Sequence, residues 1–166
     1  DFVKMTSEGS GYTVDEINRD GEEISPRTKL IDAIFSNASY TSAHDAIFNA
    51  QRKEIVKLAA NAPCIIVGRC ADYILRDMPN VVKVFVWAPM SDCIKNVKVL
   101  EPSLSDKEAE RKIKKIDAHR SDYYRYYTCR EWDSFKNYDL CINSSSAGFD
   151  KTAKYIEEFV KIKLGK

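Results

Sequence analysis

The sequence predicts an α/β protein in which helices flank a parallel β-sheet. Short, β-rich apolar runs alternate along the chain with helical patterns, and this alternation is typical of parallel α/β sheets. The 166 residues, 44% of them hydrophobic, suit one domain with a sizeable core. No apolar run reaches the roughly 18 residues of a membrane span, and no export signal is recognisable. We therefore expect neither a membrane protein nor a secreted one.

Each expected element has its own signal in the sequence. Three apolar runs predict strands buried on both faces, at residues 64–67, 81–88 and 139–143. Ser42 can cap a helix with Ile47, Gln51 and Ile55 on one face, which Asn61 and Pro63 end. Four further helices are expected at 71–75, at 91–100, at 105–127, and around Tyr155, Ile156, Phe159 and Val160.

The first part of the chain has weaker signals. Residues 1–40 are polar and interrupted by glycines and a proline, so we expect a poorly packed lead-in before a single domain at 41–166. Glu16, Asn18, Asp20 and Gly21 stand where a calcium loop would place its first ligands and its turn glycine. The twelfth position of that loop is Arg27 in place of a bidentate Glu, which excludes the calcium site.

Composition limits the possible partners. The chain has 26 Lys and Arg against 25 Asp and Glu, a net charge of +1, so no general basic field favours nucleic acid or an anionic membrane. Any anion site must be local. The five cysteines show no C-x-x-C spacing, which predicts no metal site and reduced thiols in a cytoplasmic protein. They are Cys64, Cys70, Cys93, Cys129 and Cys141.

The first candidate site follows the expected strand at 64–67. Ligands of parallel α/β sheets bind beyond the carboxyl ends of the strands, where Gly68, Arg69 and Asp72 stand. Gly68 permits a sharp turn, Arg69 offers a planar fork for a phosphate or a base edge, and Asp72 can orient Arg69 or bind a base. An ion pair between Arg69 and Asp72 at a helix start explains the same spacing, and the sequence leaves both readings open.

The second candidate site is the end of the long helix. Arg120, Asp122 and Arg125 fall within two turns and can converge on one ligand, although a solvated, charged helix is the commoner explanation. The helix starts with a capping box of Ser105 and Glu108. It has few apolar positions, namely Ala109, Ile113 and Ile116. The tyrosines that surround the charged residues, at 123, 124, 126 and 127, are expected to pack rather than to stack on a base.

Three stretches resemble the cytidylate-kinase-like family, a branch of the P-loop nucleoside-monophosphate kinases, over about residues 43–162. They are "CIIVGRCADYILRDMPNVVKVFVWAP", "LSDKEAERKIKKIDAHRSDYYRYYT" and "EW…NYDLCINSS", in the family's order. The resemblance implies a three-layer P-loop NTPase architecture and ATP- and Mg²⁺-dependent phosphorylation of a nucleoside monophosphate, CMP or dCMP. It also implies that Gly68, Arg69 and Asp72 bind the acceptor nucleotide.

The same resemblance assigns residues 105–130 to a mobile lid. Arg120 and Arg125 then stabilise the transferring phosphate, and Asp122 orients them. The chain departs from the family at Cys93, where an Arg is common and only Lys95 and Lys98 supply nearby charge.

No stretch matches G-x-x-x-x-G-K-[ST]. We therefore expect a sheet incomplete at its N-terminal side and a chain inactive by itself, through truncation or through loss of catalysis. A non-catalytic regulatory or interaction domain is the alternative function. A nucleic-acid-binding module is disfavoured by the net charge.

Overall fold

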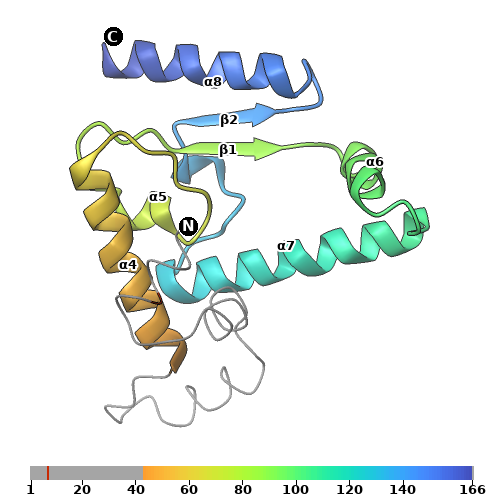
Figure 1. Cartoon of the computed structure of the whole chain (residues 1–166), viewed down its shortest axis with the longest axis horizontal. Coiled ribbons are helices and arrows are strands. Elements are labelled where there is room, and N and C mark those ends of the chain that lie inside the picture. The colour runs from red at the N-terminus through yellow and green to blue at the C-terminus, as the bar shows by residue number, and fades with distance from the viewer. Residues whose placement is uncertain (1–6, 8–42, 166) are drawn as a thin grey trace. The chain divides into compact units, whose positions relative to one another are not determined.

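The computed structural model describes Ser7 and residues 43–165, whose helices and strands are shown in Figure 1. The lead-in at 1–40, the excluded calcium loop and the Ser42 cap lie outside these residues. A membrane-spanning helix is absent from the described part of the chain. The elements are α4 (Ala43–Asn61), α5 (Ala71–Ile74), β1 (Val84–Trp87), α6 (Met90–Leu100), α7 (Asp106–Thr128), the 3₁₀ helix η1 (Phe135–Asn137), β2 (Leu140–Asn143) and α8 (Phe149–Leu164).

Backbone contacts divide the chain into two compact units, and each is described by itself. The described part of the first unit consists of residues 43–75 and 119–129. The second unit holds residues 76–118 and 130–165 of the described chain. The long helix α7 contributes its C-terminal turns to the first unit and its N-terminal turns to the second.

The first unit is built around one face of α4. Ile47, Gln51 and Ile55 are fully buried, and their spacing of four residues places them on the same face of the helix. The helix ends at Asn61, as the Asn-x-Pro stop signal predicts. The predictions of α4 and of its buried face are therefore confirmed.

The second unit contains a two-stranded parallel sheet. Strand β1 pairs with β2 in a register that joins Val84 to Leu140 and Trp87 to Asn143, and α8 runs alongside β2 (Figure 1). The expected parallel sheet is confirmed for this pair. Strand β1 is shorter than the predicted strand at 81–88, and Val86 and Trp87 are 49% and 47% exposed. The prediction that the strands are buried on both faces is therefore wrong, because the described residues do not cover this two-stranded sheet on both sides.

The predicted strand at 64–67 is wrong. These residues have no regular secondary structure, and Ile65 and Val67 are 94% and 85% exposed. A run of apolar, β-favouring residues becomes a strand only when neighbouring strands take up its backbone N–H and C=O groups. Among the described residues this segment has no strand partner.

The start of α7 follows the sequence closely. The hydroxyl of Ser105 accepts the N–H of Glu108, while the Glu108 carboxylate accepts the backbone N–H of Ser105 at 2.8 Å. This reciprocal pair is the predicted capping box. Ala109 and Ile113 are buried, whereas Ile116 is 39% exposed. This stretch of α7 therefore buries few side chains, as its small number of apolar positions predicts.

A partly exposed ion pair joins the end of α8 to the start of β2. The Asp139 carboxylate accepts the backbone N–H of Lys83 at 2.8 Å and the ammonium of Lys163 at 2.6 Å. Lys163 also donates to the carbonyl oxygen of Val81. Partial burial raises the pKa of Asp139, but the hydrogen bonds and charges of Lys163 and Lys83 outweigh it, so the pKa lies below its usual value.

We predict that Asp139→Asn lowers the free energy of unfolding by about 1–2 kcal/mol at pH 7, because it removes charge-assisted hydrogen bonds. The pKa is depressed in the folded state, so the stabilisation is complete above the unfolded value of about 4 and is lost as the pH falls through the folded value. Urea unfolding of the wild type and the variant at pH 7 and pH 3 measures the difference in their free energies of unfolding. Equal loss of stability at both pH values would contradict the prediction, and the exposed Asp133→Asn is the matched control.

Candidate functional site

A left-handed turn sets the first half of the site. Gly68, Arg69 and Cys70 have φ angles of 73°, 57° and 54°, and the Ala71 N–H donates to the Gly68 carbonyl at 3.0 Å. Glycine adopts this conformation freely, as predicted for Gly68, whereas each non-glycine residue there costs roughly 1–2 kcal/mol. Burial of Cys70 and Ala71, which are 3% and 6% exposed, offsets part of this cost. The turn leaves Arg69 half-buried and leads directly into α5.

Asp72 lies in the first turn of the short helix α5 and contacts α7. Its Oδ2 accepts a hydrogen bond of 2.6 Å from the hydroxyl of Tyr124, which is 3% exposed. This length is typical of a hydroxyl that donates to an ionised carboxylate. Asp72 forms no ion pair with Arg69 in the part of the chain that the structure describes. The ion-pair reading of the Arg69–Asp72 spacing therefore finds no support in the geometry.

The second half of the site lies on the last turns of α7. Arg120 and Arg125 are exposed and Asp122 is half-buried. Because residues 119–129 pack with residues 43–75, the structure places all six sequence-predicted site residues in the same compact unit. They are Gly68, Arg69, Asp72, Arg120, Asp122 and Arg125. Guanidinium groups are chemically suited to a phosphate ester, and the hydrogen bond from Tyr124 to Asp72 joins the two halves of the site.

Aromatic packing holds these turns of α7 on α4. The ring of Tyr127 stacks on Phe48 with centroids 3.8 Å apart and planes 4° apart, and Tyr123 meets both rings edge-on. Burial, together with the neighbouring Tyr123, Asp45 and Tyr126, raises the pKa of Tyr127 well above its usual value. Its hydroxyl therefore stays protonated at neutral pH. The tyrosines Tyr123 and Tyr124 are buried, as expected for side chains that pack.

Two residues of this site were not assigned from the sequence. Gln51 was counted only as a position on the α4 face, yet its fully buried Oε1 accepts a hydrogen bond of 3.3 Å from the Tyr123 hydroxyl. Its Nε2 has no hydrogen-bond partner within the part of the chain that the structure describes. Tyr124 was counted only as packing. A glutamine within an apolar helix face was an available signal for a buried polar contact, but no sequence signal linked Tyr124 to Asp72.

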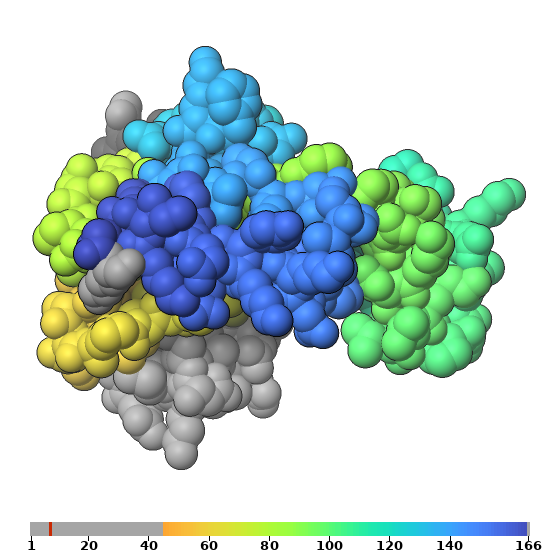
Figure 2. Space-filling view, turned by 90° about the horizontal axis from the view of Figure 1, so that it is seen from above, coloured from red at the N-terminus to blue at the C-terminus, as the bar shows by residue number. Residues whose placement is uncertain are grey.

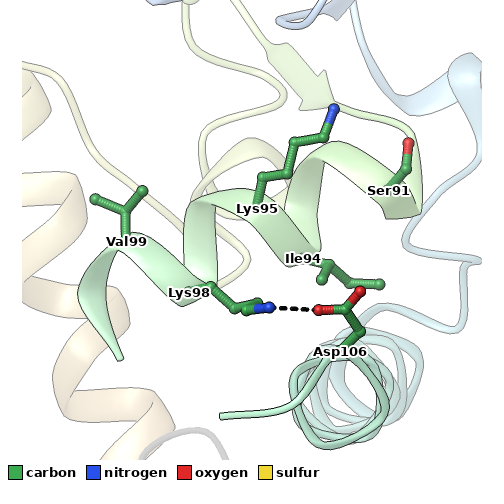
Figure 3. A pocket seen from close by; sticks show the side chains of 6 residues that line it. All are labelled: Ser91, Ile94, Lys95, Lys98, Val99 and Asp106. Carbon is green, nitrogen blue, oxygen red and sulfur yellow. Dashed lines mark hydrogen bonds and ion pairs between the residues drawn. The ribbon is translucent and has the colours of Figure 1, made fainter. Parts of the chain in front are cut away.

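The second unit has an open cleft of about 550 Å³ between α6 and the start of α7, which lie side by side in Figure 2. Figure 3 shows Lys98 of this cleft paired with Asp106 at 2.5 Å. Lys95 pairs with Asp92 at 2.7 Å. Both lysines of the cleft thus have an anionic partner in this structure.

Cys93 of α6 supplies no positive charge where the family commonly has an Arg. Its Sγ donates to the carbonyl oxygen of Ala88 at 3.6 Å. Burial, followed by the charges of Asp117 and Asp92, raises the pKa of the thiol, which is therefore neutral at pH 7. The other four cysteines are also free thiols. The described residues include no group of three or more potential metal ligands.

Comparison with known proteins shows which proteins the chain resembles. A model of the cytidylate kinase-like family matches residues 1–146 and thus includes the polar lead-in. A cytidylate kinase from Methanosarcina barkeri (strain Fusaro / DSM 804) is 27% identical over 101 residues, which make up 60% of this chain. The matched region spans 54% of that relative, about half its length.

A solved structure resembles the chain as well. The crystal structure of an uncharacterized protein from Eubacterium ventriosum ATCC 27560 matches with a TM-score of 0.67 and 27% identity, over 80% of this chain and 79% of the other. The matched family model covers well over half of the chain, and its stretch contains the Gly-Arg turn and the arginines of α7. The chain therefore belongs to the cytidylate kinase-like family.

Proposed function

We propose that this protein transfers a phosphoryl group from ATP to a nucleoside monophosphate, CMP or dCMP, on a P-loop NTPase architecture. Membership of the cytidylate kinase-like family supports a kinase-type reaction. The observation that carries the proposal is that residues 69–72 and the arginines of α7 belong to the same compact unit. A nucleotide kinase needs both acceptor contacts and cations at the transferred phosphate.

Arg69 and Asp72 hold the acceptor in this proposal. The fork of Arg69 binds a phosphate through two parallel hydrogen bonds, and the strained turn at 68–70 holds that side chain where α5 begins. Asp72 binds the base or the sugar through hydrogen bonds that its carboxylate accepts. Gly68 lets the backbone approach the ligand closely because it has no side chain.

Arg120 and Arg125 act on the transferring phosphoryl group. Charge spreads over the oxygens of this group during transfer, so cations held at that place lower the barrier. Asp122 orients the two guanidinium groups. Residues 105–130 are the proposed lid, which excludes water when both nucleotides are bound.

ATP and Mg²⁺ supply the phosphoryl group and neutralise its charge. No described residue is assigned to the metal or to the cradle of the ATP phosphates, because the described chain has neither a cluster of metal ligands nor a match to the phosphate-loop motif. The steps that we assign to this chain are therefore acceptor binding and charge stabilisation.

We predict that two arginine variants of the full-length protein separate binding from chemistry. Arg69→Ala raises the KM for CMP about 10- to 100-fold, the loss expected for a charge-assisted hydrogen bond. Arg125→Ala lowers kcat about 100-fold with a smaller change in KM, because its contact forms in the transition state. Asp122→Ala resembles a milder Arg125→Ala.

Steady-state kinetics with ATP, Mg²⁺ and each monophosphate measure these effects, and circular dichroism shows that each variant is folded. Arg52→Ala changes an exposed arginine of α4 that has no assigned role; it is the matched control and keeps wild-type kinetics. A wild-type kcat in Arg125→Ala would contradict the catalytic role of α7. Absence of turnover with every monophosphate would favour a regulatory or interaction domain.

A further inference from the structure

We propose that Tyr124 is a positioning residue that fixes the Asp72 carboxylate for the acceptor nucleotide and so makes acceptor binding depend on the placement of α7. The inference rests on the proposed function. It starts from a single contact, the 2.6 Å hydrogen bond from the Tyr124 hydroxyl to Asp72 Oδ2, which joins residues 52 positions apart.

Among the described residues, the bond from Tyr124 is the hydrogen bond found at the Asp72 carboxylate. The helix α5 has four residues, and its first turn cannot restrict a carboxylate that is only half-buried. A carboxylate offers about four lone-pair positions, and the bond to Tyr124 uses one of them on Oδ2. Because this bond fixes the plane of the carboxylate, it also fixes where the remaining positions point.

Tyr124 is itself held firmly. Its ring is buried, and its carbonyl oxygen accepts a hydrogen bond of 2.6 Å from the hydroxyl of Thr128, which is 5% exposed. Its neighbour Tyr123 is buried and donates to Gln51 on α4. The hydroxyl that contacts Asp72 therefore has a defined place relative to α4 and α5.

The same turns of α7 carry the proposed catalytic arginines. Arg120 precedes Tyr124 by four residues, which places the two side chains on one face of the helix, and Arg125 is adjacent in sequence. A movement of these turns therefore moves the arginines and the Asp72 partner together. The geometry predicts that acceptor binding favours the position of α7 seen here and that displacement of these turns weakens acceptor binding.

The test is CMP binding by calorimetry to the full-length protein and to four variants. Tyr124→Phe removes one oxygen atom and keeps the buried ring, and we expect it to weaken CMP binding about 5- to 20-fold. Asp72→Asn weakens CMP binding at least as much. The double variant Asp72→Asn/Tyr124→Phe binds within about twofold of Asp72→Asn, because Tyr124 acts through Asp72.

Tyr138→Phe is the matched control. It makes the same chemical change in the second unit, removes the hydrogen bond that the Tyr138 hydroxyl donates to the carbonyl oxygen of Trp132, and leaves Asp72 with its partner. We expect CMP binding within about twofold of wild type. In turnover, Tyr124→Phe raises the KM for CMP and changes kcat less than about threefold, whereas a partly unfolded enzyme would show a lower kcat with unchanged KM.

Thermal unfolding by circular dichroism sets a temperature at which every variant is folded. Wild-type CMP affinity in Tyr124→Phe, together with weaker binding in Asp72→Asn, would overturn the positioning role and leave the proposed function intact. A double variant much weaker than Asp72→Asn would overturn it too, because Tyr124 would then act independently. Failure of the wild-type protein to bind any monophosphate would overturn the proposed function, and the positioning role with it.

Discussion

The packing of the last turns of α7 on α4 and α5 is the interaction on which the candidate site depends. Its contacts include the stack of Tyr127 on Phe48 and two hydrogen bonds, from Tyr123 to Gln51 and from Tyr124 to Asp72. Offset or stacked aromatic pairs contribute about 0.5–1.5 kcal/mol beyond their buried area. This packing brings the charged residues of α7 into the unit that contains the Gly-Arg turn. Without it, the two candidate clusters would be unrelated segments of sequence.

The turn at 68–70 shows how the same unit tolerates strain. Two of its residues, Arg69 and Cys70, have left-handed backbone conformations that side chains disfavour. The buried side chain of Cys70 and the helical hydrogen bonds that its carbonyl oxygen accepts from Tyr73 and Ile74 hold the turn in place. A backbone outlier of this kind is a reason to suspect function, since the surrounding structure must stabilise it. Here the outlier carries the arginine that we assign to the acceptor.

Cations can gather locally in a chain that has almost no net charge. In the second unit, the lysines of α6 have acidic partners within 4 Å, and Cys93 is a neutral thiol. In the first unit, the side chains of Arg120 and Arg125 are exposed on turns of α7 whose Tyr123 and Tyr124 are buried. Surface ion pairs contribute little stability, so their main effect in α6 is to balance charge. The net charge of the whole chain therefore does not exclude a local anion site.

The sequence by itself determined most of the elements. Periodic apolar residues and local stop signals gave the bounds of α4 and α6 to within a few residues, and the capping box of α7 depends on residues three positions apart. Such signals involve residues that are close together in the sequence, so they can be recognised without the structure. The candidate site residues could also be identified from the sequence, because Gly68 and Arg69 are neighbours and the arginines of α7 share two turns. Only the tertiary structure decided the rest. Residues 64–67 have the composition of a strand but no strand partner among the described residues, and the contacts of Asp72 with Tyr124 and of Gln51 with Tyr123 join residues 52 and 72 positions apart. Strand pairing and buried hydrogen bonds depend on which distant groups meet, and composition and spacing do not encode that.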